Sequence, residues 1–428
     1  MCGRRARTLR LGGPPVYQRN IAHRVSALMD VHPVVLLGGA RQSGKSTLVR
    51  ALVDSGLDAE YVTLDDPVPL AAAAGDPDAF VAGLPDRAII DEVQRAPGLF
   101  RAIKRAVDRD RRPGRFLLTG SADVMLLPGA AEYLAGRMGV ATLWPLSQGE
   151  LRGVRETFID RVFERGASGW RAKPSERAAL VDAVLRGGFP PAVDAASEFA
   201  RNEWLDAYAG LLLQREVSSI ANVERLGDLA RLLAYLATRA GTLANMADVS
   251  RALGMPKTTV VRYVSLLEAA YAIGFVPSWA ADPGRRHVKA PKVVPTDSGL
   301  TARLMRVDAA RLAVDPNAFG PLLESFVVME LRKQATWADT EVRVHHYRTP
   351  DGREVDVVLE DARGRVVGIE VKAAAGLGAS DTTGLGALRA RLAERFVAGV
   401  VLHDAPGATV LGDRVVSLPV SALWQSYA

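Results

Sequence analysis

The sequence predicts an α/β protein in which a parallel sheet with helices comes first, a helical region follows, and a second α/β region ends the chain. Three observations predict this class. A glycine-rich loop stands between a strand-like and a helix-like run near the N-terminus, apolar residues recur at helical spacing in the middle, and short strands dominate the C-terminal part. A chain of 428 residues, 48% of them hydrophobic, can bury the cores of about two or three domains.

The first element is a strand, a loop and a helix around residues 39–46. The loop reads GARQSGKS, follows the apolar run 34–37 and fits G-x-x-x-x-G-K-[ST] at every fixed position. Such a loop can wrap phosphate oxygens, because glycine lets the backbone approach closely and successive N–H groups create positive potential. Lys45 adds a point charge, and the Ser46 hydroxyl can be a ligand of Mg²⁺. The expected nucleotide-binding residues are Gly39, Ala40, Arg41, Gln42, Ser43, Gly44, Lys45, Ser46 and Thr47.

Two more strand-like runs end in polar residues. The run AIIDE ends in Asp91 and Glu92, where one carboxylate can orient the Mg²⁺ shell and the other can polarise the attacking water. An acid pair also ends many ordinary strands. The run FLLTGS ends in hydroxyls, so Thr119 or Ser121 is expected to contact the terminal phosphate or to position water, although turn chemistry alone also favours Thr-Gly-Ser.

Five segments resemble a large family of prokaryotic AAA-type ATP-binding proteins with an uncharacterised C-terminal region: GARQSGKSTLV, YVTLDDP, IIDEVQ, LLTGSA and LAGRM. The resemblance covers nearly the whole chain and implies ATP and Mg²⁺ as cofactors. The ATPase residues that it implies are Lys45, Ser46, Asp91 and Glu92, with Ser121 as the phosphate sensor. It also implies that Arg137, after an Ala-Gly pair, stabilises transition-state charge in its own subunit or in a neighbour within a homo-oligomer. A surface or packing arginine is the alternative at this position.

Composition limits the setting and the partners. The single cysteine, Cys2, excludes an internal disulfide and a thiolate metal cluster, and no long apolar span predicts a membrane helix. We therefore expect a cytoplasmic protein without a membrane partner. Residues 1–20 predict a basic arm without the apolar segment of a signal peptide. The formal net charge of +6 and pI near 9.5 are compatible with a nucleic-acid partner without requiring one.

The middle of the chain predicts helices. Residues 21–150 are the expected ATPase core, and residues 151–240 the expected helical lid, because apolar residues recur there at helical spacing after the breaker GGFPP. In residues 241–310, one short helix ends at Gly254 and a second begins after a turn, which predicts a helix-turn-helix. The strand-like stretch YAIGFV that follows suits a winged helix.

The second of these helices offers a surface for DNA. It is expected to bury Val260, Val261, Val264 and Leu267. The residues expected to be exposed and to contact phosphates or base edges are Lys257, Thr258, Thr259 and Arg262. Winged helices also bind proteins, so a protein partner is the alternative.

Residues 311–428 predict a helix over 319–333 and strands over 344–348, 354–359 and 366–372. Asp356 and the pair Glu370-x-Lys372 then lie on adjacent strands, and Glu370 and Lys372 share a face because strand side chains alternate. This constellation resembles the PD-(D/E)XK nuclease fold, in which acids hold a divalent metal and the lysine positions water. The resemblance implies Glu324 as the helix acid and a metal set of Glu324, Asp356 and Glu370, with Lys372. Adjacent strand residues His345 and His346 point to opposite faces and offer no competing zinc pattern.

The predicted fold is therefore an α/β P-loop AAA-type ATPase core with a helical lid and a winged helix, followed by a C-terminal α/β PD-(D/E)XK-like domain. The expected function is ATP- and Mg²⁺-dependent hydrolysis that remodels DNA or drives translocation along it, with branched DNA as the suggested substrate. Two alternatives stay open: a nucleotide-gated regulatory or antitoxin-like switch that binds protein, and a metal-dependent nuclease licensed by ATP. DNA-stimulated turnover separates the first reading from the switch.

Overall fold

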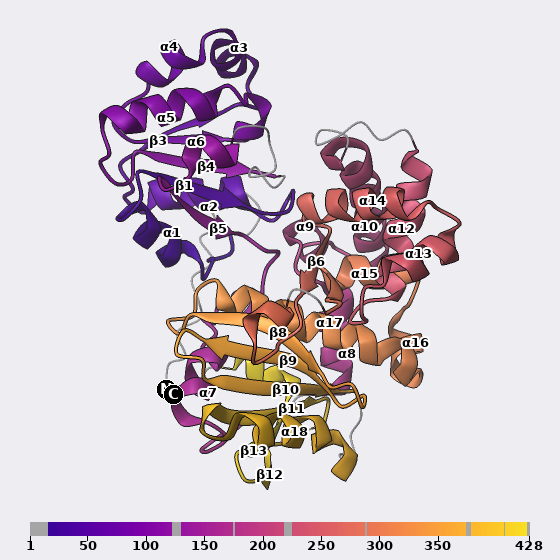
Figure 1. The fold of residues 1–428 in the computed structure, drawn as a ribbon. Helices are drawn as coiled ribbons and strands as arrows, with labels where there is room; N and C mark the ends of the chain where they lie inside the picture. Colours follow the sequence, from indigo (N-terminus) through magenta and orange to yellow (C-terminus); the bar gives the residue numbers. More distant parts are fainter. Residues whose placement is uncertain are drawn as a thin grey trace. The chain divides into compact units, whose positions relative to one another are not determined.

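The computed structural model describes residues 16–121, 130–173, 176–217, 225–286, 289–373, 378–405 and 407–425. The chain forms two compact units (Figure 1). The first combines Met1–Leu146, Leu211–Glu224 and Leu266–Ala272; the second combines Ser147–Gly210, Arg225–Ser265 and Ile273–Ala428. Cys2 and most of the predicted N-terminal arm lie outside the described residues.

The first unit contains a five-stranded parallel sheet. The strands are β1 (Val34–Gly38), β2 (Glu60–Thr63), β3 (Ala88–Asp91), β4 (Phe116–Gly120) and β5 (Met138–Thr142), in the order β2-β3-β4-β1-β5. The strand β1 pairs in parallel with both β4 and β5. Strands β1, β3 and β4 are buried along their whole length, as their continuous apolar runs require. The predicted parallel-sheet core is thus confirmed.

Helices connect these strands. They are α1 (Ala22–Met29), α2 (Lys45–Asp54), α3 (Pro67–Gly75), α4 (Pro77–Ala82), the short η1 (Val93–Arg95), α5 (Leu99–Arg109) and α6 (Ala130–Leu134). Helix α5 presents Leu99, Phe100, Ile103 and Val107 at helical spacing to a core that includes Ile90 of β3. Because all strands are parallel, their carboxyl ends meet at one edge of the sheet, which is where ligands bind in such folds.

The second unit begins with a helical region, as the sequence predicts. The helices of this region are α7 (Phe158–Arg165), α8 (Arg177–Arg186), α9 (Pro190–Val193), α10 (Glu198–Leu211), α12 (Leu226–Thr238), α13 (Met246–Leu253), α14 (Lys257–Ala269), α15 (Ser298–Met305) and α16 (Ala309–Val314). The last residue of α10 and residues 266–269 of α14 belong to the first unit. The side chain of Asn245 caps α13, and Gly254 ends it with φ +65°. Strands β6 (Ile273–Val276) and β7 (Lys292–Pro295) then pair as an antiparallel hairpin. The two predicted helices around Gly254 are thus confirmed.

A mixed sheet of six strands ends the chain. The strands are β8 (Val342–Arg348), β9 (Glu354–Asp361), β10 (Val366–Lys372), β11 (Phe396–His403), β12 (Thr409–Gly412) and β13 (Val415–Pro419), in the order β12-β13-β11-β10-β9-β8. Strands β8, β9 and β10 are antiparallel neighbours, whereas β11 runs parallel to β10. Helices α17 (Pro316–Ala335) and α18 (Thr383–Leu392) pack on the sheet. The predicted helix and three strands are confirmed with ends shifted by a few residues.

Two expectations need correction. Val261, expected in the core, is 45% exposed, because α14 turns the neighbouring Val260 and Val264 inward instead. The predicted arm of residues 1–20 extends too far, because Arg19 is buried within the first unit, where it donates hydrogen bonds to backbone carbonyls. Within the described residues, no helix is both long and apolar enough to cross a membrane.

Candidate functional site

The glycine-rich loop lies at the carboxyl edge of the parallel sheet, between β1 and α2. Gly39 has φ +147°, and a Cβ atom added there would lie 2.2 Å from the carbonyl oxygen of Leu143. Gly44 has φ +98°, a left-handed conformation that side chains disfavour. The glycines of the motif are therefore required by the backbone path of the loop.

Polar groups are gathered inside this loop. Lys45 is only 4% exposed, and its Nζ donates hydrogen bonds of 2.9 Å to the carbonyl oxygens of Gly39 and Ala40. The hydroxyl of Ser43 is buried and has no hydrogen-bond partner among the described residues. A buried ammonium together with an unsatisfied hydroxyl fits a phosphate ligand, which would supply acceptors to both groups.

Arg19 supports the loop from a distant part of the chain. One guanidinium nitrogen donates to the carbonyl oxygen of Ser43 at 2.7 Å, and another donates to that of Trp144 at 2.6 Å. The arginine thus ties the loop to the segment after β5. Sequence reasoning missed this residue, because it lies in the stretch that was assigned to the arm.

Asp91, at the end of β3, receives hydrogen bonds from three different elements. The Ser46 hydroxyl donates at 2.9 Å and the Tyr61 hydroxyl at 2.6 Å, and Thr119 donates to the other carboxylate oxygen. Burial and the neighbouring Asp91 carboxylate raise the pKa of Tyr61, which keeps this hydroxyl a donor. The predicted pair Ser46 and Asp91 is thus brought together, and two oxygen-bearing side chains in contact can share Mg²⁺.

Glu92 follows directly in a left-handed conformation with φ +59°, so the extended strand ends at Asp91. The Gln94 amide donates to the Glu92 carboxylate and also donates to the Ser121 hydroxyl at 3.0 Å. Burial raises the pKa of Glu92, and the Lys45 ammonium partly opposes that effect. The Lys45 charge therefore acts on Glu92, and Gln94 links Glu92 to Ser121. Gln94 lies in the motif IIDEVQ, but its sequence context predicts no role for it in the site.

Arg137 lies at the amino-terminal ends of the strands, opposite the end where the P-loop lies. It precedes β5, its carbonyl oxygen accepts a hydrogen bond from the N–H of Val34 at the start of β1, and its guanidinium pairs with Asp108 at 2.6 Å. The P-loop follows the opposite end of β1, about 16 Å away for a strand of this length. The prediction that Arg137 acts on nucleotide bound to its own subunit is therefore wrong, and its action on a neighbouring subunit stays a prediction.

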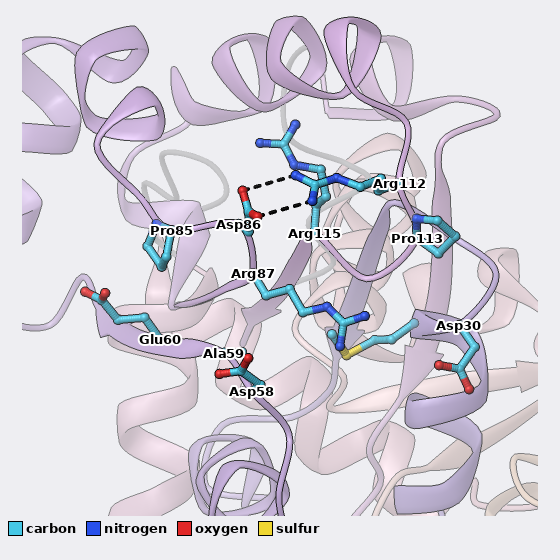
Figure 2. Close-up of a pocket in the computed structure, with 11 residues that line it drawn as sticks. Asp30, Asp58, Ala59, Glu60, Pro85, Asp86, Arg87, Arg112, Pro113 and Arg115 are labelled. Atoms are coloured by element: carbon cyan, nitrogen blue, oxygen red, sulfur yellow. Dashed lines mark hydrogen bonds and ion pairs between the residues drawn. The ribbon is translucent and has the colours of Figure 1, made fainter.

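A separate pocket of about 840 Å³ opens at this same amino edge (Figure 2). Arg112 in its wall is paired with Asp86 and with Asp110. The pocket lies at the starts of the strands, whereas the P-loop follows their ends, so the two are at opposite ends of the sheet.

Replacement of Arg19 by methionine is expected to destabilise the first unit by about 2–3 kcal/mol, since two charge-assisted hydrogen bonds are lost. Nucleotide affinity should fall as well, because the loop carbonyl of Ser43 loses its anchor. Thermal unfolding and titration with a fluorescent ATP analogue measure the two effects. The matched control is Arg24→Met on the exposed face of α1. Equal stability and affinity in both variants would contradict the anchoring role.

The residues predicted to contact DNA lie at the start of α14. Lys257, Thr258 and Arg262 are exposed, and Thr259 is half-buried. The Arg262 guanidinium lies 5.3 Å from the centre of the Tyr263 ring, within cation–π range. The four residues thus form an exposed, partly basic helix face, here called the α14 face.

The β6–β7 hairpin is docked onto the C-terminal sheet. The N–H of Trp279 donates to the carbonyl oxygen of His346 at 2.6 Å, and the N–H of His346 donates to that of Pro277 at 3.0 Å. Between the two strands of the hairpin, Arg286 pairs with Glu360 of β9 at 2.5 Å. The hairpin is therefore occupied by intramolecular contacts.

The C-terminal carboxylates meet around a lysine that the sequence did not place among them. Lys292 of β7 is 2% exposed, and its Nζ lies 2.7 Å from Glu324, 2.7 Å from Glu354 and 3.3 Å from Asp356. We call these four residues the Lys292 cluster. Burial lowers the pKa of Lys292, but the three carboxylates outweigh this effect and raise it overall. The ammonium therefore stays charged.

The other predicted residues lie beside this cluster. Burial and the neighbouring Asp356 carboxylate raise the pKa of Glu370 to about 9. Lys372 lies 3.6 Å from Glu370 and 3.9 Å from Asp381. In the part of the chain that the structure describes, no three His, Cys, Asp or Glu side chains are placed to share a metal ion. The predicted metal set of Glu324, Asp356 and Glu370 does not fit, because Lys292 lies between Glu324 and Asp356.

Family comparisons divide the chain into three matched segments. The AAA domain family matches residues 31–152. Two families described as domains of unknown function, DUF8612 and DUF4143, match residues 177–311 and 319–423.

Two mycobacterial relatives match over most of their length. They are the uncharacterized proteins Mb2031c of Mycobacterium bovis and Rv2008c of Mycobacterium tuberculosis, each 32% identical over 369 residues, or 86% of this chain and 76% of the relative. The chain belongs to their family. Its first unit is an AAA-type P-loop ATPase domain, and that fold supports ATP binding and hydrolysis.

Solved structures give more distant likenesses. The Walker-type ATPase PabY2304 of Pyrococcus abyssi is 14% identical and aligns over 71% of this chain and 99% of its own, with a TM-score of 0.43. A RuvB variant of Thermotoga maritima is 18% identical, over 61% of this AAA protein and 90% of its own chain, with a TM-score of 0.28.

Proposed function

We propose that this AAA protein is an ATP- and Mg²⁺-dependent ATPase that remodels DNA or moves along it. The observation that carries the ATPase part is the meeting of Ser46, Asp91 and Glu92 beside the P-loop lysine. The DNA part is supported by the exposed α14 face and by the net charge of +6. Branched DNA is the proposed substrate.

Each residue near the P-loop has a distinct proposed task. Lys45 and the loop N–H groups bind the phosphates, and Ser46 with Asp91 holds Mg²⁺, which when bound neutralises phosphate charge. Glu92 accepts the proton of water, for which burial has moved its pKa toward the working pH. Gln94 holds Glu92 and Ser121 in one arrangement, so that a change at either residue is passed to the other.

Assembly completes the proposed site. Arg137 carries a positive charge at the amino edge of the sheet, away from its own P-loop, and is 20% exposed. In a homo-oligomer it supplies transition-state charge to the nucleotide of a neighbouring subunit. A reducing cytoplasm is the proposed setting, which the single cysteine supports.

Steady-state ATP hydrolysis with Mg²⁺ tests this function. The rate is measured without nucleic acid and then with duplex, single-stranded or four-way-junction DNA. We expect at least one DNA form, the junction above all, to stimulate turnover, because a motor couples its hydrolysis to its track. Lys45→Ala should abolish the rate with every DNA.

The α14 face is tested in the same assay. Exchange of both Lys257 and Arg262 for glutamate should weaken DNA binding at least about tenfold and reduce its salt dependence, since phosphate contacts are lost. Basal hydrolysis should not change. The control is Arg311→Glu, an exposed arginine on α16. Turnover that no DNA changes, together with no DNA binding in a gel shift, would sink the proposal and favour the protein-binding switch.

A further inference from the structure

We propose that Lys292 is a built-in cation that takes the place of a divalent metal in the Lys292 cluster, so that the C-terminal domain contains no metal-dependent nuclease centre. The fold resemblance noted above implies a metal at Glu324, Asp356 and Glu370. These residues do not fit a metal ion, because the Lys292 ammonium lies between Glu324 and Asp356. This inference concerns the C-terminal domain and does not depend on the proposed motor function.

The carboxylates of the cluster surround the Lys292 ammonium and balance its charge. A lysine Nζ carries three N–H groups. Here three carboxylates lie within 3.3 Å of it, one from α17 and two from β9. Glu354 and Asp356 both face the lysine because they are two residues apart on one strand. The ammonium is thus paired with carboxylates on every side that these residues occupy.

Burial makes the ammonium difficult to displace. Lys292 is 2% exposed, and the side chains of Glu324 and Asp356 are 17% and 13% exposed. A metal entering this space would have to displace a charged side chain that is almost fully buried. The cost of an unpaired buried charge opposes that exchange.

The neighbouring groups are also engaged. The second carboxylate oxygen of Asp356 accepts the N–H of Val371 at 2.9 Å. Glu370 has a cation of its own beside it, because the Lys372 ammonium lies 3.6 Å from its carboxylate. The ammonium on β7 therefore holds the hairpin to α17 and β9, and the cluster joins structural elements instead of serving as a reaction centre.

Mn²⁺ binding to the nucleotide-free full chain tests the inference, with electron paramagnetic resonance to count bound ions. Wild type and Asp356→Asn should bind the same number, because neither has a cation site in the cluster. Lys292→Met should gain one Mn²⁺ per chain, bound at least about tenfold more tightly than any ion at this place in wild type. That gain should disappear again in Lys292→Met with Asp356→Asn. Lys289→Met, an exposed lysine near β7, is the control and should gain nothing.

Three results would overturn the inference. The first is a Mn²⁺ ion in wild type that Asp356→Asn removes. The second is Mg²⁺-dependent cleavage of junction DNA that this variant abolishes. The third is a folded Lys292→Met that gains no ion. If Lys292→Met does not fold, the comparison of wild type with Asp356→Asn decides alone. DNA-independent ATP turnover would reject the motor proposal and leave this inference unaffected.

Discussion

Glu92→Gln should lower ATP turnover by about 10²–10⁴-fold, because the amide cannot accept the proton that the carboxylate takes from water. Nucleotide binding should be retained, since Lys45, Ser46 and Asp91 keep their contacts with the loop and with each other. Glutamine has nearly the same shape, so the link to Gln94 can be rebuilt with an amide oxygen as acceptor. Single-turnover hydrolysis and titration with a fluorescent ATP analogue separate the two quantities.

The control for this variant is Glu60→Gln. Glu60 begins β2 at the amino edge of the same sheet, is exposed, and lies far from the P-loop. It should hydrolyse ATP at the wild-type rate. If Glu92→Gln also kept that rate, another group would have to accept the proton, and the role of Glu92 would be limited to its hydrogen bonds.

The P-loop and its acids could be predicted because each is a local signal. The motif of residues 39–46 specifies its own backbone path, and Asp91 with Glu92 directly follows a strand that is apolar along its length. In a parallel sheet, strand ends collect at one edge, so local signals far apart in the sequence converge in space. The contact between Ser46 and Asp91, 45 residues apart, follows from this rule.

Partners that come from unmarked segments could not be predicted. Arg19 reaches Trp144, which is 125 residues away, and nothing near either residue indicates the contact. Lys292 stands at the head of an apolar strand, where its neighbours Val293 and Val294 indicate only burial. The acids around it were visible as alternating strand residues, but a lysine 64 residues before Asp356 carries no sign of the pairing. These acids predict a metal, whereas the structure places the Lys292 ammonium among them.

The placement of Arg137 shows the limit of resemblance. The segment LAGRM matches the family pattern, yet the residue precedes β5 and therefore lies at the amino edge of the sheet. A shared motif identifies the type of residue at a position. Whether that residue lies near the P-loop depends on whether it precedes or follows its strand, and Arg137 precedes β5.

Lys292→Met should lower the free energy of unfolding of the second unit by about 3–5 kcal/mol at pH 8, because three buried or half-buried carboxylates lose their countercharge. Methionine keeps most of the side-chain volume, so the loss measures charge more than packing. Urea unfolding followed by tryptophan fluorescence gives the value. Lys289→Met is again the control and should unfold like wild type.

The pH dependence of that loss identifies its cause. In wild type, burial and the Asp356 carboxylate raise the pKa of Glu324 to about 8 from its usual 4.5. A carboxyl whose pKa is raised on folding contributes stability that is complete below 4.5 and is lost as pH rises through the folded value. The Lys292 ammonium opposes this rise, so the pKa of Glu324 should rise further without it, and Lys292→Met should lose less stability at pH 5 than at pH 8. Adding Glu324→Gln should restore part of the stability at pH 8, because one unpaired charge is removed. A loss of equal size at both pH values would mean that Lys292 stabilises the unit by packing, and the charge assignment would fail.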